Sequence, residues 1–92
     1  MKLKRHKSFI KDWRKVSLTD GQYEKFIIYV GSLLKGEALP PEALDHPLKG
    51  EYDDFREFHL GGDMLIIYQV DDEQLVLFLM GTHSKLFLIF SC

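Results

Sequence analysis

Apolar residues in the first third of the chain recur every three or four positions, which is the spacing of one face of a helix. Ser8, a residue type that often caps helices, comes directly before such a run at Phe9–Val16. A longer run starts at Thr19 with the spacing of a capping box and extends to about Lys35, where a glycine follows. The pattern predicts two helices, preceded by a short strand at Leu3–His6.

After Gly50 the pattern changes to the alternation and short apolar runs that are typical of strands. Turn residues at Gly61-Gly62 and an acidic run at 71–73 separate these runs. Glu37–Pro47 is predicted as a loop, and His83–Phe90 fits a short helix or a strand equally well. Three strands are therefore predicted in this half: Asp53–Leu60, Asp63–Val70 and Gln74–Met80.

These elements predict a single α+β domain over residues 1–92, with two N-terminal helices packed on an antiparallel sheet of three to four strands. A content of 46% hydrophobic and 28% charged residues is ordinary for globular proteins and argues against a disordered chain. The apolar runs are far shorter than the roughly 20 residues of a membrane span. One cysteine, Cys92, and no visible signal peptide favour the cytoplasm.

The formal net charge of -2 hides a strong asymmetry along the chain. Residues 1–15 carry seven basic groups and one acid, whereas residues 16–92 carry five basic groups and thirteen acids. A basic segment of this density is one form of electrostatic footprint for phosphate groups. The simpler interpretation is a solvated face that keeps a small protein in solution.

Candidate chemistry centres on histidines in short polar contexts at 46, 59 and 83. Glu57 and His59 share one face of a predicted strand, and Asp63 begins the next strand, so a tight hairpin brings the three together. Imidazole transfers protons near neutral pH, and neighbouring carboxylates orient it. Each histidine taken alone is more simply a surface or hydrogen-bonded structural residue.

Two chemistries use such a set of residues. Zinc accepts three imidazoles and a carboxylate, but the short ligand spacings H-E-x-x-H and C-x-x-C do not occur in this sequence. Metal-free cleavage of RNA needs a base for the 2′-hydroxyl, an acid for the departing 5′-oxygen and a cation for the pentavalent phosphate. His, Asp or Glu, and Arg supply all three.

Four blocks of sequence together resemble the YafQ-type branch of the RelE toxin superfamily: Asp45–Gly50, Phe55–His59, Gly62–Tyr68 and Gly81–Phe87. The resemblance implies a RelE-like fold and a toxin of a type II toxin–antitoxin pair. It implies an endoribonuclease that cuts mRNA on the ribosome and inhibits translation without a cofactor. The implied partners are a cognate antitoxin, mRNA and the ribosome, with operator DNA bound only through the antitoxin complex.

The resemblance also implies roles for individual residues. Phe87 matches an aromatic residue that holds substrate, and Glu57 stands where close relatives carry aspartate. Four further positions match catalytic residues of the family: His46, His59, Asp63 and His83.

As a mechanistic hypothesis, one of His46 and His59 deprotonates the 2′-hydroxyl, oriented by a neighbouring carboxylate, either Asp63 or Glu57. His83 protonates the leaving oxygen, and a 2′,3′-cyclic phosphate forms. Which histidine is the base stays open at this point.

Substrate contacts are expected from three further places. Arg56 or Lys49 offsets charge on the phosphate, Phe87 stacks on a base, and the basic residues between Lys2 and Lys15 contact RNA. Two other classes of function stay open. One is a non-catalytic module that binds the ribosome or RNA, and the other is a metal-binding protein that uses the three histidines.

Overall fold

The structure is a computed structural model that describes residues 1–90, with side chains described to residue 86. Within that range the chain forms five strands, three helices and two short 3-10 turns, η1 and η2. In chain order the elements are β1 Lys2–Arg5, α1 Lys7–Lys15, α2 Asp20–Leu34, η1 Pro41–Ala43, β2 His46–Pro47, η2 Gly50–Tyr52, β3 Arg56–Gly61, β4 Met64–Asp71, β5 Gln74–Thr82 and α3 His83–Phe90.

Both predicted N-terminal helices are confirmed, and local capping explains where they begin. The capping box of α2 is complete, because the hydroxyl of Thr19 accepts from the backbone N–H of Gln22 at 3.1 Å and the Gln22 side chain accepts from the Thr19 N–H at 3.0 Å. Gly36 then ends the helix with a φ of +76°, a conformation that glycine adopts without strain. α1 differs from the prediction, since its cap is the ring of His6, which accepts from the N–H of Ser8.

The sheet has the order β1-β5-β4-β3-β2, and it corrects the prediction of an antiparallel sheet of three to four strands. β1 lies parallel to β5, with Lys2 opposite Gln74. β2 adds a fifth strand inside the predicted loop, where His46 pairs with Glu57. A two-residue strand is too short to produce a periodic pattern, and the distant pairing of β1 leaves no local signal of its direction.

The segment that fitted helix or strand equally well forms α3. At its start the hydroxyl of Thr82 accepts from the backbone N–H of Lys85 at 3.3 Å. Its sequence is apolar through most of its length, so the pattern alone did not separate the two structures. Cys92 and the side chain of Phe87 lie outside the described residues.

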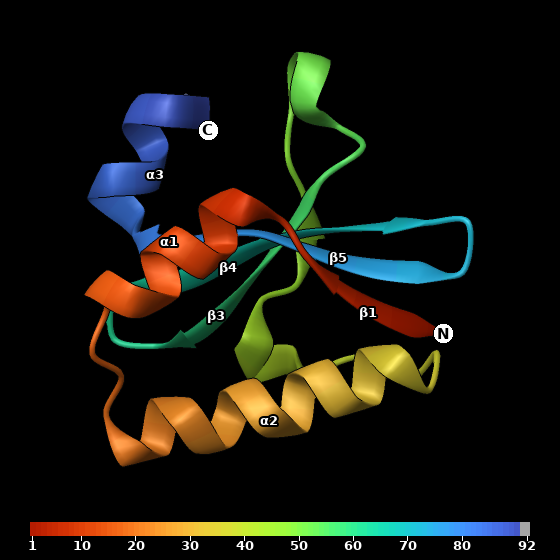
Figure 1. The fold of residues 1–92 in the computed structure, drawn as a ribbon, viewed down its shortest axis with the longest axis horizontal. Coiled ribbons are helices and arrows are strands. Elements are labelled where there is room, and N and C mark those ends of the chain that lie inside the picture. Colours follow the sequence, from red (N-terminus) through yellow and green to blue (C-terminus); the bar gives the residue numbers. More distant parts are fainter. Residues whose placement is uncertain (91–92) are drawn as a thin grey trace.

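Each face of the sheet is covered by different helices. α1 and α2 pack on one face, around a core that includes Phe9, Tyr29, Phe58 and Tyr68. α3 and the segment around η2 cover the other face, where a smaller cluster contains Leu48, Leu65, Ile67 and Leu86. Figure 1 shows α2 below the sheet, α3 above it, and α1 in front of the strands. β4 is buried on both faces, which explains its continuous apolar run.

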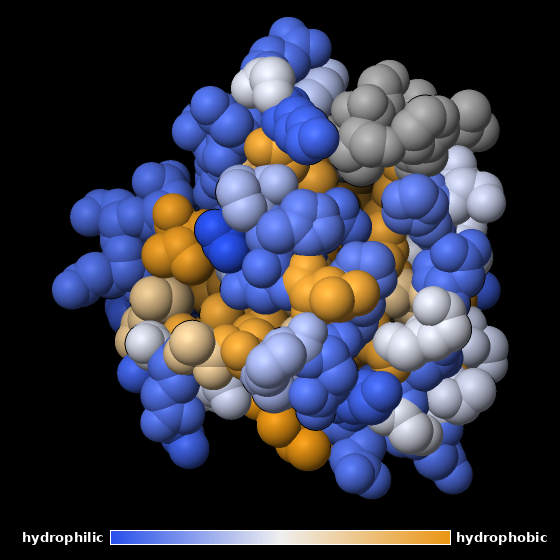
Figure 2. All heavy atoms as spheres, turned by 180° about the vertical axis from the view of Figure 1, so that it is seen from behind, coloured by the Kyte–Doolittle hydropathy of each residue, from blue (hydrophilic) through white to orange (hydrophobic). Residues whose placement is uncertain are grey.

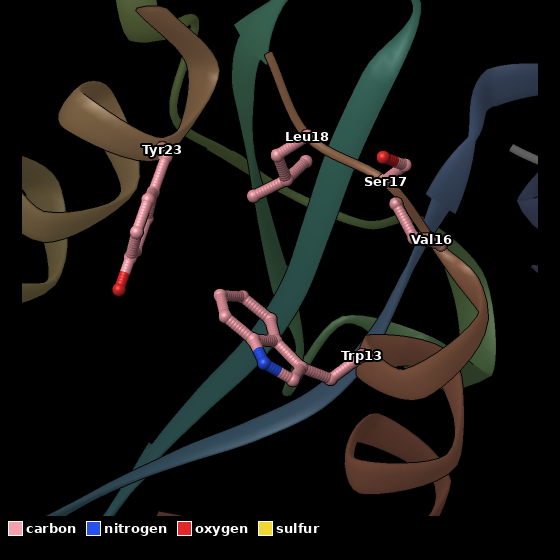
Figure 3. A pocket seen from close by; sticks show the side chains of 5 residues that line it. All are labelled: Trp13, Val16, Ser17, Leu18 and Tyr23. Atoms are coloured by element: carbon pink, nitrogen blue, oxygen red, sulfur yellow. The ribbon is translucent and has the colours of Figure 1, made fainter. Parts of the chain in front are cut away.

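The surface carries small apolar areas among many polar groups. Seen from behind, hydrophobic residues show as separate patches between hydrophilic side chains (Figure 2). A shallow hollow of about 230 Å³ lies where α1 passes into α2, and Trp13 and Tyr23 reach into it (Figure 3). Within the described part of the chain, every helix falls short of the length and apolar character needed to cross a membrane.

Candidate active site

The pairing of β2 with β3 brings two of the candidate histidines to one buried carboxylate. His46 lies directly opposite Glu57 in the sheet, so their side chains emerge on the same face. The Nε2 atom of His46 is 3.0 Å from Oε1 of Glu57, and Nε2 of His59 is 3.7 Å from Oε2 of the same carboxylate. The two imidazole rings lie 6.2 Å apart between centroids. Glu57 therefore links His46 to His59.

Glu57 is unusual because it is a carboxylate of which only 3% is exposed. One oxygen contacts His46, but Oε2 has no hydrogen-bond partner among the described residues. A buried polar atom without a hydrogen-bond partner costs about 1–3 kcal/mol, so such atoms are rare, and a catalytic role is one reason for their presence. Here the free oxygen is the one that faces His59.

Both nitrogens of His46 face acceptors. Nδ1 lies 2.7 Å from the carbonyl oxygen of Leu44, and a carbonyl only accepts hydrogen bonds. Nε2 lies against the Glu57 carboxylate. An imidazolium satisfies both contacts, since each of its ring nitrogens donates. Leu44 has a φ of +51°, a strained backbone for leucine, and this turn directs its carbonyl to the ring.

The chain at His46 is anchored from the other face of the sheet. One oxygen of Asp45 accepts from Nε of Arg56 at 3.1 Å and from the hydroxyl of Tyr68 at 2.7 Å. Burial, together with the hydrogen bond to Asp45, raises the pKa of Tyr68 far above its ordinary value. Arg56 is thus separated from Glu57 by the alternation of β3, and the structure does not bring it into the histidine cluster.

His59 is largely enclosed, and burial lowers its pKa from the ordinary value of 6.5. The charges of Glu57 and Asp63 act in the opposite direction, while His46 and His83 lower the pKa further. The net decrease keeps the ring neutral near pH 7. A neutral imidazole next to a carboxylate has the properties of a proton acceptor.

Asp63 and His83 complete the cluster from the next turn and from α3. The backbone N–H of His83 donates to the carbonyl oxygen of Asp63 at 2.9 Å. This contact follows from the register of β4 and β5, which places Met64 opposite Thr82. Both residues influence the pKa of His59 through their charge. The predicted residues that meet at this end of the sheet are His46, Glu57, His59, Asp63 and His83.

The remaining predicted residues lie differently. Lys49 is exposed at the start of η2, three residues after His46. Phe87 belongs to α3, but its side chain is outside the described residues. Asp45 and Tyr68 were not predicted as site residues, although both lie in the sequence blocks that carry the family resemblance. Their contact depends on a pairing across the sheet that the sequence does not display.

A family model described as the YafQ toxin of bacterial type II toxin–antitoxin systems matches residues 1–88. The chain belongs to the YafQ family. The mRNA interferase toxin YafQ of Escherichia coli strain K12 is 38% identical over 61 residues, which make up 64% of this chain and 66% of that relative. The matched segment thus spans slightly less than two thirds of the relative's length.

Solved structures agree with the YafQ assignment over nearly the whole chain. A copper-bound mutant toxin from Helicobacter pylori is 39% identical, with a TM-score of 0.80 over 94% of this chain and 98% of that one. YafQ in the DinJ–YafQ complex of E. coli is 27% identical, with a TM-score of 0.80 over 92% and 96%. The resemblance to YafQ-type toxins and the α+β fold are therefore confirmed.

Proposed function

We propose that this YafQ-family toxin is an endoribonuclease that cleaves mRNA on the ribosome by general acid–base catalysis. Relatives named mRNA interferase toxin YafQ support the substrate and the reaction. One observation carries the mechanism: a largely enclosed imidazole, His59, faces the free oxygen of the buried Glu57 carboxylate. In this pair His59 is the base, and the carboxylate of Glu57 stabilises the ring once it has received a proton.

In the proposed reaction His59 removes the proton from the 2′-hydroxyl, because its lowered pKa leaves it neutral and able to accept. The ring then becomes an imidazolium, and the Oε2 atom of Glu57 at 3.7 Å offsets the new charge. Asp63 contributes a second negative charge from the adjacent turn. This assignment makes His59, and not His46, the base.

His83 is the proposed acid. It gives a proton to the 5′-oxygen as the bond to phosphorus breaks, and the 2′-oxygen closes a 2′,3′-cyclic phosphate. The ring of His46, held between Leu44 and Glu57, contacts the phosphate, and the exposed Lys49 supplies positive charge for it. Arg56 is assigned a positioning role, since it holds Asp45 and thereby the backbone that carries His46.

The proposed partners follow from the relatives and from the charge distribution. Crystal structures of the E. coli DinJ–YafQ toxin–antitoxin complex support a cognate antitoxin for this chain. Binding of operator DNA through the antitoxin complex is proposed from the family resemblance. The basic residues of β1 and α1 provide the surface for ribosomal RNA or the mRNA backbone. We expect a protein with these partners to act in the cytoplasm.

Metal binding is a second candidate, favoured by the copper-bound and metal-bound toxins from H. pylori. Imidazole and carboxylate are donors that copper and zinc accept. Among the described residues, however, no group of three or more His, Cys, Asp or Glu side chains is arranged to hold an ion. No step of the proposed reaction is therefore assigned to a metal.

The proposal is tested by adding purified protein to a translation mixture and mapping cuts in the mRNA. His59→Ala and His83→Ala should each slow cleavage by about 10²-fold or more. His6→Asn is the matched control: His6 stacks on Phe78 outside the cluster, and asparagine keeps a cap for α1. Association with RNA or ribosomes without scission by the parent protein would instead show a non-catalytic binding module.

A further inference from the structure

A buried carboxylate outside the histidine cluster joins two elements far apart in the sequence. Asp12 of α1 is 7% exposed. Its Oδ2 atom accepts from the backbone N–H of Met80 in β5 at 3.0 Å, and its Oδ1 atom accepts from Nζ of Lys85 in α3 at 3.2 Å. The proposed reaction makes no direct use of Asp12 or Lys85.

The contact with Met80 begins where β1 ends. β1 pairs with β5 only as far as Leu77, and the N–H of His6 makes the last backbone contact, to the Leu77 carbonyl oxygen at 2.9 Å. The chain then turns into α1, so β1 no longer supplies acceptors to the rest of β5. Asp12 provides the acceptor that the N–H of Met80 needs in this buried position.

Lys85 reaches the same carboxylate along an open path over Gly81. A Cβ atom added to Gly81 would lie 3.1 Å from Cδ of Lys85, closer than ordinary packing allows. Glycine at this position therefore lets the lysine stem lie against the end of β5. The stem leads the ammonium group to Asp12, while about half of the lysine side chain stays exposed.

Asp12 thus holds both sides of the junction between β5 and α3. Met80 lies three residues before His83, and Lys85 lies two residues after it. α3 has only eight residues, and a helix of that length needs tertiary contacts to keep its place. Further contacts at this end include the N–H of His83 on Asp63, the N–H of Lys85 on the Thr82 hydroxyl and the buried side chain of Leu86.

We infer that Asp12 and Lys85 are positioning residues for His83: their ion pair fixes α3 against β5 and thereby holds the imidazole of His83 toward His59. The catalytic part of this inference rests on the proposed function, whereas the structural part does not. Neither residue touches the reacting atoms, so each acts through the placement of α3.

The test compares two variants that break the ion pair from opposite sides. Asp12→Asn keeps an oxygen for the N–H of Met80 but presents no charge to Lys85. Lys85→Met keeps the apolar stem over Gly81 and removes the ammonium group. Each should lower the single-turnover rate of mRNA cleavage by roughly ten-fold with less than a two-fold change in KM, because misplacement of a catalytic group acts on the chemical step. Lys85→Arg should restore most of the rate.

The directions in which the two variants change the cleavage rate and RNA binding distinguish a positioning role from a direct effect of charge. If net charge near RNA were decisive, Asp12→Asn would bind RNA more tightly and Lys85→Met less tightly, and the changes would lie in KM. Positioning predicts a loss of rate in both variants and no further loss in the double variant. Lys35→Met, at the C-terminal cap of α2, removes the same charge and should leave the rate unchanged.

Amide hydrogen exchange supplies a readout that does not depend on activity. In both variants the amides of residues 83–86 should exchange roughly ten-fold faster, while those of β4 keep the parental rate. Parental exchange in α3, or parental cleavage rates in both variants, would overturn the inference. A parent protein that fails to cut mRNA would overturn the proposed function alone, and the exchange rates would still decide whether the ion pair holds α3. If Asp12→Asn does not fold, Lys85→Met alone is compared with the parent protein by the same exchange and cleavage measurements.

Discussion

Replacing Glu57 with glutamine should separate the stability of the fold from the chemistry of the site. The substitution keeps the size of the side chain and removes its charge. It weakens the pair with His46, an imidazole whose side chain is 51% exposed, and such a pair contributes about 1 kcal/mol or less. It also relieves the buried Oε2 atom, which lacks a hydrogen-bond partner at a cost of about 1–3 kcal/mol.

The glutamine amide at position 57 can hydrogen-bond to both histidines, whereas the carboxylate leaves one oxygen without a hydrogen-bond partner among the described residues. Its oxygen accepts from His46, and its NH₂ group faces the neutral ring of His59, which accepts. We therefore expect the free energy of unfolding to stay the same or to rise by about 1–2 kcal/mol, measured by urea denaturation. The rate of mRNA cleavage should fall by about 10²-fold, because an amide does not stabilise the imidazolium that forms on His59.

Glu51→Gln is the matched control for this prediction. Glu51 lies exposed in η2, and the change removes the same charge from a position six residues earlier in the chain. Both its stability and its cleavage rate should equal those of the parent. Parental cleavage by the Glu57→Gln variant would refute the proposed role of the carboxylate. A loss of more than about 2 kcal/mol in stability would show that Glu57 serves mainly to anchor the fold.

Three further predictions follow from the same structure. Because burial lowers the pKa of His59 below 6.5, the unfolded chain binds that proton more readily. The free energy of unfolding should therefore decline as the pH falls below about 6.5, and His59→Gln should remove the share of this decline that comes from His59. The rate of mRNA cleavage should also fall on the acid side of the same pH. Tyr68→Phe deletes the hydroxyl that donates to Asp45 at 2.7 Å; urea denaturation should show a loss of about 1–2 kcal/mol, and cleavage should slow because the backbone at His46 loosens. Finally, if the basic residues 1–15 contact RNA, mRNA binding should weaken steeply between 50 and 200 mM salt, and an unchanged affinity over that range would contradict this contact.

Local signals in the sequence were sufficient for much of the fold. The capping box at Thr19 and the glycine after α2 fixed the limits of that helix closely, and the alternation in β3 placed Glu57 and His59 on one face. The same alternation put Arg56 on the opposite face, and the structure shows it bound to Asp45 there. Only its charge supports the predicted contact of Arg56 with the phosphate.

The remaining features depend on contacts between distant residues. His46 reaches Glu57 through a strand of only two residues, which leaves no periodic pattern in the sequence. β1 and β5 pair across most of the length of the chain, so neither the pairing nor its parallel direction has a local signal. The bond between Asp12 and Lys85 likewise joins residues 73 positions apart, and Asp12 looks like an ordinary surface acid on an otherwise basic helix.

The chemistry at the cut ends of the mRNA tests the central claim most directly. Fragments are collected from a translation mixture treated with the parent protein, and the group at each new 3′ end is identified by mass spectrometry. Attack of the 2′-hydroxyl with His59 as base and His83 as acid predicts a 2′,3′-cyclic phosphate, at sites that disappear with His59→Ala. New 3′ ends that carry a free hydroxyl group would contradict the account, because they require a water molecule, and not the 2′-oxygen, as the attacking group.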